Sequence, residues 1–385
     1  MYNIDDYGDM IADRQRTGAF ARALEAAVRP GDVVLDIGTG TGIFPLFACR
    51  FGASRVHAIE SAPHIQVARE TAAANGVQER VIFHEGSSRR IELPERVDVI
   101  VSDLRGQLPM FRQSLLAIID ARRRFLAPGG RIIAERDDLW MAPVEAPNLA
   151  KAFRQPWCEN PWGFDLSAGL PLAANTVARG PVGAQQLLAA PMLYAAVDYV
   201  RAETAELQAR AQMRIERDGE ADGLATWFDA VLFEDIVLSN APGAPLSYGQ
   251  AFLRWPKAVK VTAGDIVEVD VRADLVGTDY VWSWQSTVRR AQGTVVESFR
   301  QSTFLGEPMT PSMMQAISSR HVPDLGEDGD VDRLVLEHMR GRNSLGQIAA
   351  VLAARYPHRF AGEAEALRHV AELSLRYRRM PGESR

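Results

Sequence analysis

The sequence has few cysteines and no long apolar run. Cys49 and Cys158, the two cysteines among 385 residues, stand in unrelated contexts and form neither a disulfide framework nor a metal-binding spacing. No apolar stretch reaches the roughly 18 residues that a membrane-spanning helix needs. The polar segment from Tyr2 to Arg16 does not fit a secretory signal. We therefore expect a cytoplasmic protein without a metal site or a membrane partner.

An excess of positive charge is also lacking. The net charge is −6, so no overall field attracts nucleic acid, and we expect no nucleic-acid partner. Hydrophobic residues make up 47% of the chain and charged residues 24%, as in globular proteins. A chain of 385 residues is too long for one ordinary core, which indicates two or three domains.

The first third of the chain alternates between predicted helices and short apolar strands. This alternation predicts an α/β fold with a doubly wound, mostly parallel sheet over residues 1–140. Strands are expected at 33–37, 55–59, 81–84, 97–102 and 131–134, and helices at 14–28, 42–51, 63–75 and 110–125.

The remaining sequence has a different pattern of apolar and polar residues. Residues 187–305 alternate apolar and polar positions between turn signals, which predicts antiparallel strands. We therefore expect an antiparallel β-barrel-like domain over residues 141–323. A polar linker at 324–327 precedes helices expected at 330–339, 345–355 and 363–377, which would form a small helical module over residues 328–380.

A glycine-rich turn follows the first predicted strand. Gly38, Gly40 and Gly42 would let the backbone approach a ligand at the crevice of a doubly wound sheet. The pattern is G-x-G-x-G, whereas a dinucleotide fingerprint is G-x-G-x-x-G. Asp36 precedes the loop, where it suits a cationic amino acid, and Glu60 ends the second strand, where it can bind ribose hydroxyls. These features favour S-adenosylmethionine (SAM) over NAD, with a degenerate site as the remaining alternative.

Taken together, residues 7–140 resemble the protein arginine methyltransferases. The run Met10–Arg16 is similar to that family's N-terminal helix M-x-x-D-x-x-R, which implies that Arg16 pairs with the SAM carboxylate. The glycine loop and Glu60 match the family's SAM-binding residues. The resemblance adds Ser61, beside Glu60, and the backbone N–H of Ser88 on the adenine side, although Arg89 replaces an adenine-contacting glutamate.

The resemblance also implies an oligomer. Trp157 and the run 163–167 match the opening of the family's dimerisation arm, and the spacing onward to Asp198 is similar. The arm is therefore expected near 157–198, and a homodimer is implied.

The loop after the fourth strand departs from the family. It aligns without a gap with a loop whose two glutamates bind the substrate guanidinium, but Asp103 stands at the first position and Arg112 at the second. Tyr248 ends the run 246–248, which replaces the family's T-H-W loop. Because an arginine side chain needs paired anions, Arg112 would repel it if it pointed inward, or would occupy Asp103 if the two paired. Both alternatives disfavour peptidyl-arginine as the acceptor.

The residues left for chemistry are Asp103, Arg112 and Tyr248. Asp103 is the candidate for orienting or deprotonating the acceptor, unless it only caps the next segment. Arg112 could bind a substrate carboxylate or phosphate, or lie on the surface, and Tyr248 could line the acceptor pocket or lie in the core. Arg105 could face the same pocket or an exposed loop. His57 and His84, in or beside strands, are expected to be structural.

The C-terminal helices lie outside the resemblance to arginine methyltransferases. The stretch 341–349 resembles the turn and second helix of small winged-helix or PqqD-like modules, which implies a peptide-holding role, while a packing appendage is the plainer alternative. The resulting hypothesis is a SAM-dependent methyltransferase that acts on a nitrogen or oxygen nucleophile of a peptide or peptide-derived compound, not on ordinary arginine. A small metabolite or sugar acceptor and a non-catalytic SAM-binding scaffold are the alternatives.

Overall fold

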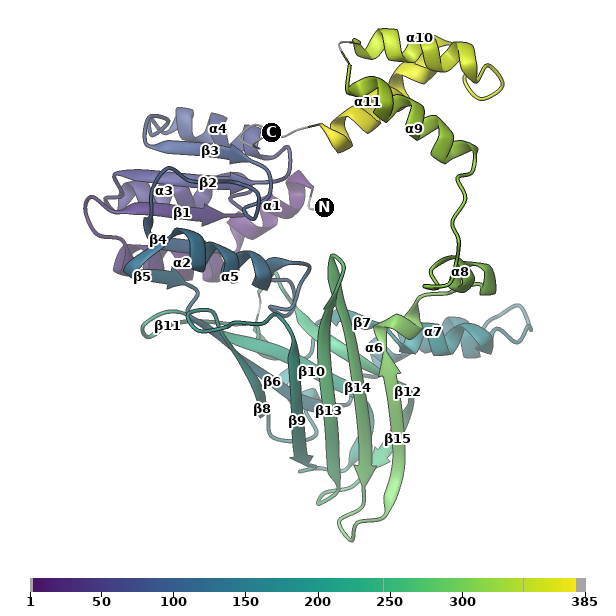
Figure 1. Ribbon diagram of the computed structural model, residues 1–385. Coiled ribbons are helices and arrows are strands. Elements are labelled where there is room, and N and C mark those ends of the chain that lie inside the picture. The colour runs from purple at the N-terminus through teal and green to yellow at the C-terminus, as the bar shows by residue number, and fades with distance from the viewer. Residues whose placement is uncertain (1–2, 245, 342, 379–385) are drawn as a thin grey trace. The chain divides into compact units, whose positions relative to one another are not determined.

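The computed structural model describes residues 3–244, 246–341 and 343–378. The chain divides into two compact units, residues 1–308 and residues 309–385. The first unit contains a parallel sheet followed by two antiparallel sheets. The α/β fold with a β-barrel-like second part is therefore confirmed (Figure 1).

The parallel sheet has the strand order β3-β2-β1-β4-β5, so the strand order reverses beside β1. Such a reversal opens a crevice at the carboxyl ends of the strands. Its strands are β1 (Val33–Ile37), β2 (Arg55–Glu60), β3 (Val81–Glu85), β4 (Val97–Ser102) and β5 (Leu126–Ile133). Its helices are α1 (Ile4–Ala12), α2 (Arg14–Ala27), α3 (Ile43–Arg50), α4 (Ile65–Ala74) and α5 (Ser114–Phe125).

Helices cover both faces of this sheet because successive strand residues point in opposite directions. Val34 packs in the cluster that contains Phe20 of α2 and Phe44 of α3. Leu35, the next residue of β1, packs instead in the cluster that contains Phe125 of α5. The strand is thus buried on both sides, which explains its continuous apolar sequence.

The helix predicted over 14–28 begins at Arg14, as expected, but two other expectations were wrong for local reasons. The run 10–16, which the resemblance implied to be one helix, is interrupted at Asp13, which ends α1 and caps α2 by accepting a hydrogen bond from the Arg16 backbone N–H at 3.0 Å. The expected helix 110–125 begins only at Ser114. Arg112 has a φ of 49°, and its backbone N–H donates to Asp279 at 3.0 Å, which holds the chain out of the helix.

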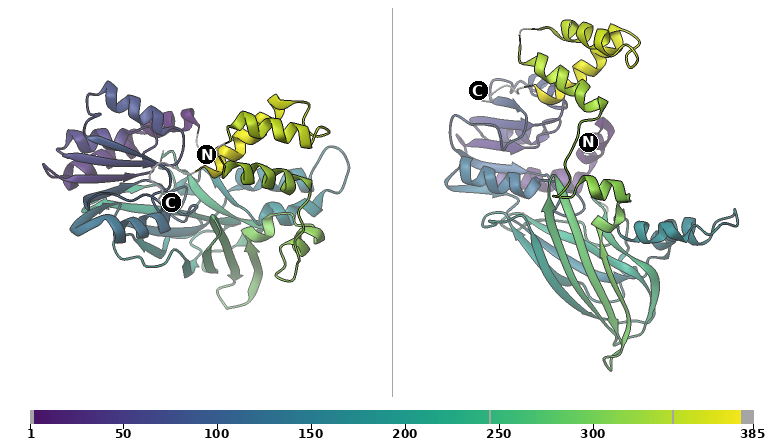
Figure 2. Two further views of the ribbon diagram at one scale, coloured as in Figure 1. Left: turned by 45° about the horizontal axis from the view of Figure 1, so that its top comes forward. Right: turned by 45° about the vertical axis from the view of Figure 1, so that its right-hand side comes forward.

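The two antiparallel sheets share one core (Figure 2). One has the path β7-β12-β10-β6-β8, with β11 beside β10, and the other has the order β15-β14-β13-β9. Trp255 of one sheet is fully buried and donates a hydrogen bond from Nε1 to Ser286 of the other at 3.1 Å. The strands are β6 (Arg136–Val144), β7 (Val177–Gly180), β8 (Met192–Asp198), β9 (Leu207–Arg214), β10 (Gly219–Phe233), β11 (Ile236–Ser239), β12 (Gln250–Val261), β13 (Ile266–Val276), β14 (Asp279–Arg289) and β15 (Val295–Ser302).

An arm leaves the β domain between β6 and β7 and projects away from the sheets (Figure 2). Its base packs through Phe153 against Trp227 and Phe252 of the sheet. Its tip exposes Trp162 and Phe164, which are 75% and 71% accessible. The arm contains α6 (Pro147–Cys158), the 3-10 turn η1 (Ser167–Gly169) and α7 (Leu170–Ala174); η2 (Ala184–Gln186) and η3 (Thr303–Gly306) are further 3-10 turns of the first unit.

The second unit is helical. A core that includes Val335, Leu352 and Val370 joins its three longer helices, as the apolar periodicity predicts. Its helices are α8 (Pro311–Ala316), α9 (Glu327–Met339), α10 (Leu345–Arg355) and α11 (Glu363–Tyr377). Within the described residues of the whole chain, no helix is long and apolar enough to cross a membrane, and no group of three or more His, Cys, Asp or Glu side chains could hold a metal ion.

Candidate functional site: a cofactor cavity joined to an acceptor cavity

The glycine loop needs its glycines for two separate reasons. Gly38, Gly40 and Gly42 have φ values of 79°, 54° and 91°, which non-glycine residues rarely adopt. Space is also short, because a Cβ on Gly40 would lie 2.5 Å from the Tyr7 ring of α1. The N-terminal helix therefore lies directly over the loop, and the backbone is left bare where β1 ends.

Asp36 lies beneath this loop as a buried carboxylate. It is 1% exposed, and neither of its oxygens accepts a hydrogen bond from the described residues. Burial raises the pKa of Asp36 to about 7; Glu60 and Asp103 add to the increase, whereas Thr39 and Arg16 oppose it. A buried anion without a partner is costly, so the position favours a cationic ligand group.

Glu60 is the second acidic residue of the loop region and closes the glycine turn. Its Oε2 accepts a hydrogen bond from the Gly40 backbone at 3.0 Å, and its Oε1 accepts one from the Ala62 backbone at 2.8 Å. These bonds fix the carboxylate at the end of β2. Each oxygen keeps a lone pair for a further donor such as a hydroxyl group.

A cavity of about 310 Å³ connects these groups. Ser61 and Ser88 line it from the ends of two neighbouring strands, together with Arg16, Glu60, Gly38 and Gly40. Ser88 is buried, and its carbonyl accepts a hydrogen bond from Arg124 at 2.6 Å. Of the residues predicted for cofactor binding, Asp36 and Gly42 do not line this cavity, although both are close in the chain to glycines that do.

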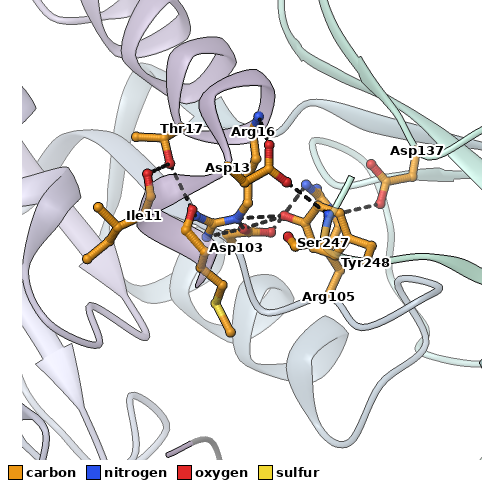
Figure 3. A network of polar contacts seen from close by, with 10 residues as sticks. Ile11, Asp13, Arg16, Thr17, Asp103, Arg105, Asp137, Ser247 and Tyr248 are labelled. Atoms are coloured by element: carbon orange, nitrogen blue, oxygen red, sulfur yellow. Dashed lines mark hydrogen bonds and ion pairs between the residues drawn. The ribbon is translucent and has the colours of Figure 1, made fainter. Parts of the chain in front are cut away.

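The Arg16 side chain already forms hydrogen bonds within the protein (Figure 3). Its Nη2 lies 2.5 Å from Oδ2 of Asp103, and its Nε donates to the same oxygen at 2.7 Å. The hydroxyl group of Tyr248 also donates to this oxygen, at 2.5 Å. Although burial alone would lower the pKa of Arg16, Asp103 and Tyr248 raise it, so the guanidinium stays charged. Two residues from distant parts of the chain, Arg16 and Tyr248, therefore meet at the Asp103 carboxylate.

The other oxygen of Asp103 faces Arg105. Nη1 of Arg105 lies 3.4 Å from Oδ1 of Asp103, and its Nε donates to Oδ2 of Asp137 at 3.2 Å. The Tyr199 hydroxyl donates to the same Asp137 oxygen at 2.7 Å. The Asp137 side chain is fully buried, and the Asp103 and Arg105 side chains are each 4% exposed. The result is a buried network with alternating positive and negative groups.

A second cavity, of about 650 Å³, opens on the other side of Asp103. Tyr248 and Ser247 line it from the β domain, and Asp6 and Asp9 line it from α1. Four residues line both cavities and so form the boundary between them: Met10, Asp103, Arg105 and Phe111. We refer to the larger one as the acceptor cavity, because it meets the cofactor cavity at the candidate catalytic carboxylate.

Arg112 neither points into the acceptor cavity nor pairs with Asp103, the two positions that the sequence suggested. It lines the cofactor cavity and not the acceptor cavity, and its guanidinium lies 5.1 Å from the centroid of the Phe111 ring. Among the described residues, Asp103 forms ion pairs with Arg16 and Arg105. The hypothesis of an Asp103–Arg112 pair was therefore wrong: the positive φ of Arg112 turns its backbone out of the expected helix, and Arg105 takes the place beside Asp103.

Sequence reasoning missed Asp137 and Tyr199 altogether. Asp137 lies in β6, a strand in which buried and less buried positions alternate. The signal that could have revealed it is an acidic residue at a position where the alternation predicts an apolar one. His57 and His84 were expected to be structural, and they contact each other at 3.0 Å through ring nitrogens. Nε2 of His57 also lies 3.2 Å from Glu95, outside both cavities.

Comparison with known proteins places this geometry in a family. Residues 15–135 match the family model described as "Ribosomal protein L11 methyltransferase (PrmA)". The chain is 30% identical over 285 residues to protein arginine N-methyltransferase 6 of Xenopus tropicalis, a match that covers 70% of this chain and 83% of the relative. The chain belongs to the protein arginine N-methyltransferase family. Such enzymes are SAM-dependent methyltransferases, so the predicted enzyme class and cofactor are confirmed.

Further relatives agree in fold. "Probable protein arginine N-methyltransferase 6" of Arabidopsis thaliana is 32% identical over 230 residues, and the match spans about half of each protein, 57% of this chain and 53% of the relative. The solved protein arginine methyltransferase 10 of Arabidopsis thaliana has a TM-score of 0.69 at 23% identity, covering 78% of this chain and 97% of its own. A Trypanosoma brucei PRMT1 enzyme–prozyme heterotetramer with AdoHcy also has a TM-score of 0.69, at 20% identity, covering 77% and 97%.

Proposed function

We propose that this arginine methyltransferase homologue transfers a methyl group from SAM to a nitrogen or oxygen nucleophile other than an ordinary arginine side chain. A peptide or peptide-derived compound is the favoured acceptor. One observation carries this proposal. Asp103, the carboxylate between the two cavities, already binds Arg16, Arg105 and Tyr248.

The residues of the cofactor cavity suit SAM. Arg16 would hold its carboxylate, Glu60 its ribose hydroxyls, and the Ser88 backbone its adenine, with Ser61 beside Glu60. The orphaned Asp36 carboxylate fits the cationic amino-acid end. When bound, SAM supplies a methyl group on a sulfonium that a nucleophile can attack in line.

The protein's own part in the reaction centres on Asp103. Asp103 lines both cavities, so it is placed to orient a nucleophile of the acceptor and to accept its proton. Tyr248 fixes the carboxylate through its 2.5 Å hydrogen bond. Arg112, in the cofactor cavity, is a candidate for binding an anionic group of a ligand.

Ordinary arginine is the competing acceptor. The relatives' names favour it, and Asp6, Asp9 and Asp13 give the acceptor cavity an acidic rim that would attract a cation. The charge balance of the buried network disfavours an arginine acceptor. A substrate guanidinium needs a pair of free anionic acceptors, whereas Asp103 is shared between two arginines of the protein itself.

The acceptor is tested with two matched peptides that differ only in one residue, arginine in the first and lysine in the second. The full chain is incubated with isotope-labelled SAM, and product is measured by mass spectrometry. We expect no arginine methylation above that of Asp103→Asn. Turnover of the arginine peptide that disappears in Asp103→Asn would show that ordinary arginine is the acceptor.

The cofactor site is tested by calorimetry. Glu60→Ala should weaken SAM binding by about tenfold to a hundredfold, because hydrogen bonds to a charged group contribute roughly 1.5–3 kcal/mol. Glu85→Ala is the matched control, since Glu85 ends the neighbouring strand β3 and does not line the cavity. Equal affinity in Glu60→Ala and Glu85→Ala would contradict the assigned role of Glu60.

Two further proposals concern the surroundings of the enzyme. We infer a homodimer through the arm, supported by the exposed Trp162 and Phe164 at its tip. Cytoplasmic location remains a proposal that rests on the two unrelated cysteines, of which Cys49 is buried and Cys158 is exposed.

A further inference from the structure

A guanidinium of the protein itself lies in the wall of the acceptor cavity. Arg105 spans the distance between two carboxylates, with Nε 3.2 Å from Asp137 and Nη1 3.4 Å from Asp103. Its guanidinium carbon lies 5.3 Å from the centroid of the Phe228 ring. Two anions and an aromatic face are the groups that bind a guanidinium in a buried site.

The charges at this position are balanced without any ligand. Burial would lower the pKa of Arg105, but Asp137, Tyr199 and Asp103 together raise it well above its ordinary value, so Arg105 remains protonated. With Arg16, the network contains two arginines and two aspartates. A third guanidinium entering from the acceptor cavity would find Asp103 already paired with two arginines and Asp137 already paired with Arg105.

The place of Arg105 makes this balance relevant to the acceptor. Arg105 lines both the cofactor cavity and the acceptor cavity, at the same boundary as Asp103. It extends from the loop after β4 to Asp137 of β6, as Figure 3 shows. The boundary at which an acceptor would meet the cofactor therefore includes this side chain.

We propose that Arg105 is a specificity-determining residue: it occupies the guanidinium position of the acceptor cavity and thereby excludes arginine side chains. The position would thus be blocked by an internal guanidinium held by Asp103 and Asp137. This inference rests on the proposed function, in which the acceptor is not ordinary arginine, and it names the side chain responsible.

The first test replaces the missing group with a small molecule. In full-length Arg105→Ala, millimolar ethylguanidinium should refill the position and raise the thermal midpoint by roughly 2 °C or more. The wild-type protein should show no such increase, and ethylammonium should not replace ethylguanidinium, because it lacks the planar pair of donors. An equal response of Arg105→Ala and wild type to ethylguanidinium would overturn the proposal.

A double variant distinguishes loss of the guanidinium site from loss of folding. Arg105→Ala leaves a buried carboxylate unpaired, which is strongly destabilising. The double variant Arg105→Ala/Asp137→Asn removes that charge, so it should fold, yet it should lose the response to ethylguanidinium because one of the two anions is gone. If the double variant responds as strongly as Arg105→Ala, the molecule binds elsewhere and the proposal fails.

The last experiment measures methylation of an arginine acceptor. Arg105→Met keeps an unbranched side chain but removes the guanidinium and its charge, and it should methylate the single-arginine peptide at least about tenfold faster than wild type. Arg154→Ala is the matched control, since it breaks the Arg154–Asp222 ion pair of 2.9 Å, whose residues line neither cavity. It should gain no arginine methylation, and no gain in Arg105→Met either would contradict the inference.

The two proposals fail in different ways. Wild type that already methylates the arginine peptide would refute the proposed acceptor, whatever ethylguanidinium does. Wild type that leaves the peptide unchanged, combined with neither rescue of Arg105→Ala nor gain in Arg105→Met, would refute the role of Arg105 and leave the acceptor proposal standing.

Discussion

Asp36 shows how one buried side chain can couple cofactor binding to pH. Its pKa of about 7 means that the carboxyl is largely protonated below neutrality in the free protein. The raised value stabilises the fold at low pH, and this contribution is lost as the pH rises from about 4 through 7. A cationic ligand group beside Asp36 favours the ionised form and reverses that loss.

SAM affinity should therefore rise with pH up to about 7 and level off above it. Below pH 7 the slope should approach about tenfold per pH unit, because binding requires release of a proton from Asp36. Calorimetry between pH 5.5 and 8.5 measures the effect. Asp36→Asn cannot titrate and serves as the control, so the same slope in wild type and Asp36→Asn would assign the proton to another group.

Among the elements, the arm between β6 and β7 is the clearest candidate for contact with a second copy. Its base is anchored by Phe153, whereas Trp162 and Phe164 at its tip are largely exposed. Large apolar side chains gathered on a projecting segment favour burial in an interface.

The double variant Trp162→Ser/Phe164→Ser should shift the protein from dimer to monomer. The loss of two aromatic anchors weakens association by at least about a hundredfold, since each contributes roughly 2 kcal/mol or more when buried. Sedimentation equilibrium measures the change. The control, Val276→Ser, alters an exposed apolar residue at the end of β13, outside the arm; an unchanged dimer in the arm variant would place the interface elsewhere.

At the scale of the whole molecule, residues 1–308 and 309–385 form separate compact units. Every residue that lines the two cavities lies in the first unit. The helical unit has a core of its own.

Removal of residues 309–385 should leave SAM affinity within about twofold of the full chain, because separate domains keep their own binding sites. If the helical unit holds a peptide acceptor, turnover of that acceptor should fall while SAM binding persists. Calorimetry and methyl-transfer assays measure the two properties separately. Undiminished transfer to the acceptor after truncation would favour a small metabolite as the substrate.

Most of what concerns the cofactor could be predicted from local sequence patterns. Periodicity located the strands of the parallel sheet to within a few residues, because buried parallel strands and amphipathic helices leave local patterns. Asp36, Glu60 and the glycine loop are also local signals, since each lies at the end of a strand or in the turn that follows. The loop's backbone φ values agree with what its glycines predict.

Which charged groups meet beside the acceptor cavity depends on how distant elements fold together. Asp103 is joined by Arg16 and Tyr248, which lie 87 and 145 positions away in the chain. Asp137 reaches Arg105 from β6 of an antiparallel sheet. The alignment of one loop placed Arg112 beside Asp103, but the backbone turn at Arg112 gave that place to Arg105. Ion pairs depend on distances between separate elements, which residue spacing does not encode, and so the donor was predictable whereas the environment of the acceptor was not.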